Sequence, residues 1–203
     1  MSQYLSEDVK QPIVHSSPGN AYLLKAPTGS GKTTCFTKDL VPEAQRRGQA
    51  VLLIVNRAVL TEQLTNSFLK PSGIPPDAVE FQQAGIYPLG DLVVCSYQYM
   101  ARRLQGIGPF EAKEYAFVVC DECHYFIADS VFTTDSAPLV NLPKVFAQSV
   151  RIYASATISP VRNVILKMEQ VVDLAEYSPY WEISPGFRYT RNNMISQMYS
   201  NST

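Results

Sequence analysis

The segment Ala26–Thr33, with the sequence Ala-Pro-Thr-Gly-Ser-Gly-Lys-Thr, combines residue types that suit phosphate binding. Gly29 and Gly31 allow a tight turn that brings successive backbone N–H groups close to phosphate oxygens. Lys32 is expected to reach the β and γ phosphates of a nucleoside triphosphate, and the Thr33 hydroxyl to hold Mg²⁺. Ala26 stands where the general pattern has its first glycine, so the match is incomplete. The predicted nucleotide-binding residues are Ala26, Pro27, Thr28, Gly29, Ser30, Gly31, Lys32 and Thr33.

The stretches on either side of this segment predict a strand and a helix. Ala21–Leu24 is apolar, as in a buried strand, and Thr34–Arg47 has no glycine and one proline. A helix that begins at Lys32 adds its positive N-terminal dipole and its unpaired N–H groups to the same anion. A strand, a glycine-containing turn and a helix in this order form the phosphate-binding P-loop. An ordinary turn that contains Gly-Ser-Gly is the less favoured alternative.

A second group of candidate residues is the acid pair Asp121-Glu122, which follows the apolar run Phe117–Cys120. In α/β sheets ligands bind beyond the carboxyl ends of the strands, so this pair is expected to face the P-loop. Asp121 would hold Mg²⁺, and Glu122 would orient and deprotonate the attacking water in phosphoryl transfer. Two acids after a strand are a weak signal alone, and the P-loop upstream makes them a strong one.

The elements that position these residues are predicted from runs that are apolar at consecutive positions. Such strands are covered on both faces, as in a parallel sheet with helices on each side. The alternation of strands and helices therefore predicts an α/β sandwich with a mostly parallel central sheet. The further predicted strands are Ala50–Val55, Leu92–Cys95, Ile152–Ala154, Val171–Leu174 and, more weakly, Val79–Gln82; the further predicted helices are Ala58–Lys70, Tyr97–Leu104, Ser136–Gln148 and Val161–Gln170.

Composition limits the classes of protein to which the chain can belong. Its 203 residues are 46% hydrophobic and 17% charged, which suits one globular domain with an appendage. The formal net charge of −1 gives no bulk electrostatic reason to expect nucleic acid, so such contacts must come from local groups. We find no membrane-spanning run and no secretory signal, and we expect a cytoplasmic protein. Cys120 and Cys123 form a C-x-x-C, but without a second ligand pair neither a metal site nor a redox pair is favoured.

Together these segments resemble the motifs of superfamily 2 helicases of the DEAD/DEAH-like group. Residues 26–33, 121–124 (Asp-Glu-Cys-His) and 155–157 (Ser-Ala-Thr) are similar to motifs I, II and III. Residues 56–63 and 95–99 are similar to motifs Ia and Ib, and all five occur in the family's order. The resemblance covers residues 21 to about 175. It implies the first RecA-like domain, a three-layer P-loop NTPase fold, with ATP and Mg²⁺ as ligands and a DECH variant of motif II.

The resemblance also implies roles outside the acid pair. His124, Ser155 and Thr157 would link the state of the γ-phosphate to movement between domains, with His124 close to the nucleotide. A path for the backbone of DNA or RNA would include Arg57, Gln63, Ser96, Tyr97 and Gln98. Several alternatives stay open: Arg57 as a solvated residue, Tyr97 and Tyr99 as core aromatics, and His124 as a core histidine. Arg102 and Arg103 are more readily explained as a solvated helix face than as a phosphate clamp.

The chain departs from the helicase pattern beyond motif III. We predict an N-terminal extension over 1–18, the RecA-like domain over 19–175, and a tail over 176–203 that leads toward a second RecA-like domain. Such a domain, in the same chain or in another, would supply the arginine finger, so the isolated chain is expected to bind ATP, to hydrolyse it poorly and not to unwind. A nucleotide-dependent module that clamps nucleic acid or protein without motor activity is the alternative from another class. A small-molecule kinase is weaker, because the region 124–150 contains no arginine for a lid.

Overall fold

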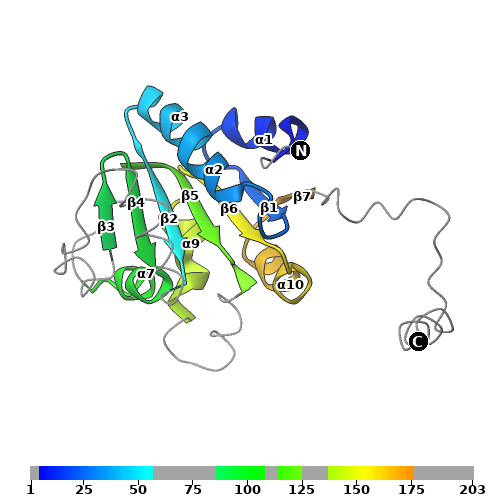
Figure 1. The fold of residues 1–203 in the computed structure, drawn as a ribbon. Helices are drawn as coiled ribbons and strands as arrows, with labels where there is room; N and C mark the ends of the chain where they lie inside the picture. The colour runs from blue at the N-terminus through cyan, green and yellow to red at the C-terminus, as the bar shows by residue number, and fades with distance from the viewer. Residues whose placement is uncertain (1–4, 57–85, 108–113, 125–136, 176–203) are drawn as a thin grey trace, which may run out of the picture.

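The computed structural model describes residues 5–56, 86–107, 114–124 and 137–175 (Figure 1). In chain order the elements are α1 (Glu7–Val14), β1 (Ala21–Lys25), α2 (Lys32–Cys35), the π-helical segment η1 (Phe36–Leu40), α3 (Val41–Arg46), β2 (Ala50–Val55), β3 (Ile86–Leu89), β4 (Leu92–Ser96), α7 (Tyr97–Leu104), β5 (Tyr115–Asp121), the 3₁₀ segment η4 (Ala137–Asn141), α9 (Leu142–Val145), β6 (Val150–Ser155), α10 (Ser159–Met168) and β7 (Val172–Ala175). None of the helices in these ranges is long and apolar enough to cross a bilayer.

The strands form one sheet with the order β3-β4-β2-β5-β6-β1-β7. Strand β3 pairs antiparallel with β4, and every other neighbouring pair is parallel. Parallel neighbours need crossover connections, which bring the carboxyl ends of their strands to one edge of the sheet. The predicted mostly parallel sheet is therefore confirmed, and the P-loop, the acid pair and the end of β6 share one edge.

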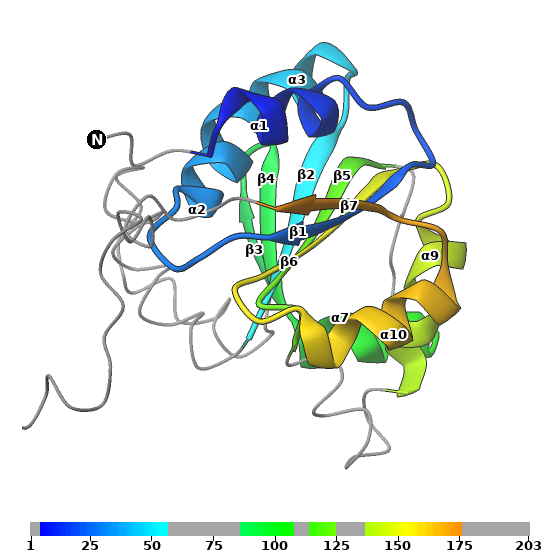
Figure 2. The same ribbon diagram turned by 90° about the vertical axis from the view of Figure 1, so that its right-hand side faces the viewer.

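Helices cover both faces of the sheet, which gives three layers (Figure 2). The α1, α2 and α3 helices lie on one face, whereas α7, α9 and α10 lie on the other. Along β5, Phe117 and Val119 belong to the hydrophobic cluster under the first group, and Val118 and Cys120 to the cluster under the second. Successive residues of a strand point to opposite faces, so a strand covered on both sides is apolar at every position. The three-layer fold is confirmed.

The predicted helix after the P-loop forms, but with a π-helical segment inside it. The chain stays helical from α2 through η1 into α3, with Pro42 in the first turn of α3. Proline has no N–H and its ring clashes with the carbonyl four residues earlier, here that of Lys38. A local widening to the π form relieves this clash without ending the helix.

The predicted helix Ser136–Gln148 is replaced in the described part by two short pieces, η4 and α9. Pro143 lies in the first turn of α9, a position that proline tolerates. It cannot donate to the carbonyl of Leu139, so one helix does not run through both pieces. The predicted helix Val161–Gln170 forms two residues earlier, as α10, with Pro160 in its first turn.

The predicted N-terminal extension contains α1, and this helix packs on the domain. Val9 and Ile13 are buried in the same hydrophobic cluster as Phe36 of the P-loop helix. The Tyr22 hydroxyl donates to the Pro12 carbonyl at 2.9 Å, which joins α1 to β1. The boundary at residue 18 stays a prediction, but α1 contributes to the core of the domain that follows it.

Some predicted segments lie outside the described residues. They are the helix Ala58–Lys70, the strand Val79–Gln82, Arg57 and Gln63 of motif Ia, and the tail 176–203. Strand β3 was not predicted from the sequence. It is four residues long, contains Pro88 and lies at the edge of the sheet, where proline is tolerated.

Candidate nucleotide-binding site

The phosphate loop connects β1 to α2, and its glycines adopt the conformation that the sequence requires of them. Gly29 has φ +80° and Gly31 has φ +83°, so both are in the left-handed region that favours glycine. Gly31 is the N-cap residue of α2, and its carbonyl accepts the first helical bond, from the Cys35 N–H at 3.0 Å. The Ser30 hydroxyl is buried without a hydrogen-bond partner. The loop thus combines a helix N-terminus with a polar group that a bound phosphate could satisfy.

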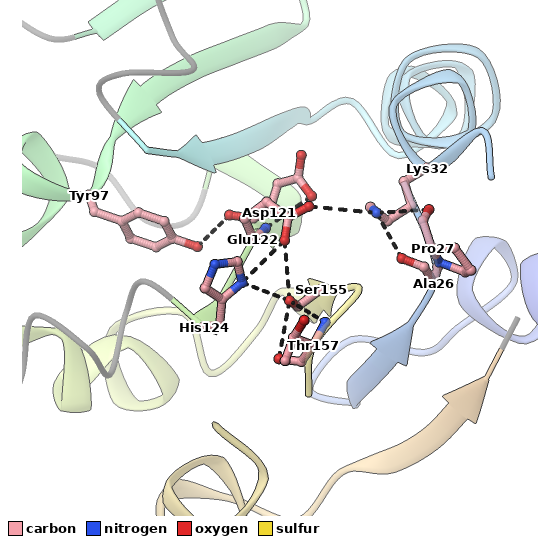
Figure 3. Close-up of polar contacts among 9 residues, drawn as sticks. All are labelled: Ala26, Pro27, Lys32, Tyr97, Asp121, Glu122, His124, Ser155 and Thr157. Carbon is pink, nitrogen blue, oxygen red and sulfur yellow. Dashed lines mark hydrogen bonds and ion pairs between the residues drawn. The ribbon is translucent and has the colours of Figure 1, made fainter. Parts of the chain in front are cut away.

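Lys32 begins α2, and its side chain lies back along the loop (Figure 3). Its Nζ donates to the carbonyl oxygens of Ala26 at 2.8 Å and Pro27 at 3.2 Å. The same atom lies 3.8 Å from Glu122 Oε1. Lys32 is only 7% exposed, so these contacts hold a mostly desolvated cation. A phosphate entering the loop would compete with neutral carbonyls for this ammonium group.

The acid pair lies at the end of β5, as predicted from the apolar run before it. Asp121 is 8% exposed, and this burial raises the pKa of its carboxyl to about 6. Lys32 opposes that shift, and Glu122 adds to it. Glu122 has φ +50°, the one non-glycine residue with positive φ in the described ranges. This conformation costs an L-residue about 1–2 kcal/mol, and such strain is concentrated at functional sites.

The side chains of Glu122, His124 and Ser155 meet near the ends of β5 and β6 (Figure 3). These strands are parallel neighbours with Asp121 opposite Ala154, so Ser155 lies beside the acid pair. The Ser155 hydroxyl is 3.2 Å from Glu122 Oε2 and 2.9 Å from His124 Nδ1. His124 Nδ1 is also 3.2 Å from Glu122 Oε2. This cluster fixes the carboxylate of Glu122 from the side opposite Lys32.

Thr157 takes part through its backbone. Its N–H donates to the Ser155 hydroxyl at 3.0 Å, and its carbonyl lies 3.3 Å from that hydroxyl. The Thr157 side chain is exposed. Of the predicted coupling residues, Ser155 and His124 contact the acid pair, and Thr157 supports Ser155.

The site can be tested for its fit to Mg²⁺. No group of three or more His, Cys, Asp or Glu side chains with metal-site geometry occurs among the described residues. Mg²⁺ does not need one, because it is usually bound through one or two carboxylates, substrate phosphates and water. Asp121 supplies a carboxylate, and Thr33 a half-buried hydroxyl in the first turn of α2. These hard oxygen donors fit Mg²⁺ in the presence of a nucleotide.

The C-x-x-C pair differs from a metal or redox site in its surroundings. Cys120 and Cys123 are fully buried, and this burial raises the pKa of both thiols well above the usual range. Reactive and metal-binding cysteines are instead stabilised as thiolates. The two thiols are packed in the hydrophobic cluster under α7 and α10.

The predicted nucleic-acid residues on β4 and α7 have different surroundings. The Ser96 hydroxyl caps α7 by accepting the Tyr99 N–H at 3.1 Å, and Ser96 is 3% exposed. Tyr97 is 5% exposed, and its hydroxyl donates to the Asp121 carbonyl at 2.9 Å. Burial leaves no face of Tyr97 for a base to stack on, which agrees with the core-aromatic alternative. Gln98 is exposed and stays a candidate for contact with a nucleic-acid backbone.

The fold and this site define an ATP-binding P-loop domain of the RecA-like kind. Over residues 3–160 the chain matches the family described as type III restriction enzyme, res subunit, and it belongs to that family. It is thus an N-terminal RecA-like, ATP-binding domain of the superfamily 2 helicase class. A comparison with curated proteins gives no match.

Solved structures support the fold. The chain is similar to a DEAD box protein from the hyperthermophile Methanococcus jannaschii, with TM-score 0.55, 16% identity and coverage of 84% of this chain and 48% of that one. A hypothetical ATP-dependent RNA helicase from Sulfolobus tokodaii gives TM-score 0.53 and 17% identity, over 83% of this chain and 51% of the other. The UvsW helicase from bacteriophage T4 gives 0.52 and 16%, over 83% and 58%. The chain spans about half the length of these structures.

Proposed function

We propose that this chain is the nucleotide-hydrolysing half of a superfamily 2 helicase or translocase, which couples ATP binding and hydrolysis to movement on DNA or RNA. The observation that carries the proposal is the 3.8 Å approach of Lys32 Nζ, from the phosphate loop, to Glu122 Oε1 at the end of β5. A cation suited to the γ-phosphate and a carboxylate suited to a water molecule are thus brought together in one ion pair. An in-line attack on a phosphoryl group needs both a positive group on the phosphate and a group that orients the attacking water.

Each residue of the site has a role in this reaction. The N–H groups at the start of α2 and the Lys32 ammonium would bind the β and γ phosphates. Thr33 and Asp121 would hold Mg²⁺, which when bound neutralises phosphate charge. Glu122 would orient a water molecule and accept its proton as the water oxygen bonds to the γ-phosphorus and the bond to the leaving ADP oxygen breaks. Ser155 and His124 would hold the Glu122 carboxylate in the required direction.

The same contacts suggest how hydrolysis is linked to movement. Ser155 contacts Glu122 directly, and α10 begins only four residues later, at Ser159. We propose that His124 and Ser155 transmit the state of the γ-phosphate to a second RecA-like domain, in the same protein or in another chain. We also propose that the sequence Asp-Glu-Cys-His functions as a DECH variant of motif II. The half-length match to solved helicases supports a second domain. Its arginine finger would raise the rate by about 10³–10⁵.

The experiment is an ATP-binding titration together with ATPase rates, measured on the purified chain with and without single-stranded DNA or RNA. Binding with a slow basal rate, and an increase in rate when the second domain is added, are the expected results. Tight binding that gains affinity for nucleic acid, without turnover under any condition, would instead favour a nucleotide-dependent clamp. Absence of ATP binding would overturn both alternatives.

A further inference from the structure

The hydroxyl of Tyr97 lies at a position that the proposed reaction does not yet explain. It donates to the backbone carbonyl of Asp121 at 2.9 Å, in a buried environment (Figure 3). Tyr97 is the first residue of α7, directly after β4, whereas Asp121 is the last residue of β5. In the sheet, β2 lies between these two strands. The tyrosine side chain therefore reaches past the end of β2 to the neighbour on its other side.

The Asp121 carbonyl, which the Tyr97 hydroxyl contacts, lies just past the point where β5 stops pairing with β2. The parallel register between β2 and β5 ends at Ile54 and Cys120, one residue before Asp121. On the other side, Asp121 is still opposite Ala154 of β6. The Tyr97 hydroxyl thus supplies a hydrogen bond on the β2 side of Asp121, past the end of the ladder. A buried carbonyl deprived of a donor would be free to turn toward another partner.

This carbonyl belongs to the peptide that joins Asp121 to Glu122. The next residue, Glu122, has φ +50°, so the chain turns sharply here and holds a conformation that few L-residues adopt. Its N–H, the other end of the same peptide, is bonded to Asp121 Oδ1 at 3.0 Å. A peptide plane held at both ends fixes the directions in which the Asp121 and Glu122 side chains leave the backbone.

We infer that Tyr97 is a positioning residue for the acid pair: its hydroxyl fixes the Asp121–Glu122 peptide and thereby aims the Asp121 carboxylate at Mg²⁺. The inference rests on the proposed function and adds a residue that touches neither nucleotide nor metal. Ser96 caps α7, so the start of the helix that carries Tyr97 is itself fixed. The burial of Tyr97, which argues against base stacking, keeps the ring from moving out of this contact.

The test is the gain in affinity for a non-hydrolysable ATP analogue when Mg²⁺ replaces EDTA, measured by calorimetry. For Tyr97→Phe we expect this gain to fall about fivefold, or about 1 kcal/mol at 1.4 kcal/mol per factor of ten, the scale of one hydrogen bond. Affinity in EDTA should stay within about twofold of the unsubstituted chain, because the phosphate loop is unchanged. Tyr99→Phe is the matched control: it removes the same atom from the same helix and keeps the ring contact with Arg103.

A double variant separates positioning from a purely structural role. In an Asp121→Asn background, Tyr97→Phe should have no further effect on the response to Mg²⁺, because both changes act through one carboxylate. An equal loss of affinity in EDTA and in Mg²⁺, or a response to Mg²⁺ that Tyr97→Phe leaves unchanged, would overturn the inference while the proposed function stands. If the unsubstituted chain fails to bind the analogue at all, the proposed function itself is wrong, and the inference with it.

Discussion

The Lys32 ammonium lies 3.8 Å from the Glu122 carboxylate, so the two charged groups proposed to act on opposite sides of the γ-phosphate face each other directly. Two backbone carbonyls of the phosphate loop hold the same ammonium. A nucleotide entering the loop would replace these neutral acceptors with charged phosphate oxygens, which form stronger bonds with Lys32. Because the same ammonium group is paired with Glu122, nucleotide binding must also rearrange this ion pair.

Replacing Lys32 with alanine should weaken ATP binding by about two orders of magnitude. The ammonium is 7% exposed, and a charge-assisted hydrogen bond to phosphate contributes about 1.5–3 kcal/mol. Calorimetric titration measures the change directly. Lys38→Ala removes an exposed lysine from the same helical run and should leave affinity unchanged. Undiminished binding by Lys32→Ala would show that the phosphate loop is assigned to the wrong segment.

Replacing Glu122 with glutamine should preserve or slightly increase ATP affinity while removing hydrolysis. Glutamine keeps the hydrogen bond from Ser155 but cannot accept a proton from water, and it releases Lys32 from its ion pair. A general base contributes about 10²–10⁴ in rate, which a phosphate-release assay detects. Glu114→Gln, just before the opposite end of the same strand, is the control. Turnover that survives in Glu122→Gln would exclude Glu122 as the base.

Replacing Ser155 with alanine should lower kcat by about three- to tenfold with little change in ATP affinity. The hydroxyl joins Glu122, His124 and the Thr157 N–H, so its loss frees the catalytic carboxylate but leaves the phosphate loop intact. Ser149→Ala matches the loss of a buried hydroxyl at the other end of β6, where Ser149 donates to the Tyr115 carbonyl. If Ser155→Ala and Ser149→Ala lower kcat equally, the loss caused by Ser155→Ala reflects reduced stability alone.

The parts of the fold that follow from local pattern could be predicted from the sequence. Strand β5 is apolar from Phe117 to Cys120 because these four residues alternate between two hydrophobic clusters. A run that is apolar at consecutive positions is typical of a strand covered on both faces. The phosphate loop was predictable because Gly29 and Gly31 must adopt positive φ between a strand and a helix. In both cases the physical requirement lies within a few residues of the chain.

The features that were not predicted depend on distant contacts. Nothing in the local sequence indicates that the Tyr97 hydroxyl reaches Asp121, because the contact depends on β2 separating β4 from β5. The packing of α1 on the domain is also difficult to predict from the sequence. Its buried residues are only Val9 and Ile13, and the other residues of the helix are mostly polar. Strand β3 is short and contains a proline, so its pairing is determined by β4 rather than by its own propensity.

The ionised form of Asp121 should destabilise the nucleotide-free protein, which gives a pH dependence of known sign. Burial raises the pKa of this carboxyl from 3.8 to about 6 in the folded state. Between these values the folded chain binds more protons at this site than the unfolded chain, so its free energy of unfolding falls as pH rises. The stabilisation that the protonated Asp121 carboxyl gives the folded chain is lost as pH rises through about 6. Its full size is up to about 3 kcal/mol.

Asp121→Asn removes this titration and should be more stable than the unsubstituted chain at pH 7.5, with the difference shrinking toward pH 4. Denaturant unfolding at several pH values measures this difference in the free energy of unfolding. Asp91 is an exposed carboxylate, so Asp91→Asn should show no comparable change. With ATP and Mg²⁺ the order should reverse, because only the unsubstituted chain supplies a carboxylate to the metal and gains the added binding energy. If Asp121→Asn were less stable at pH 7.5 without ligand, attraction to Lys32 would outweigh desolvation at this site. The carboxylate would then support the fold as well as the proposed reaction.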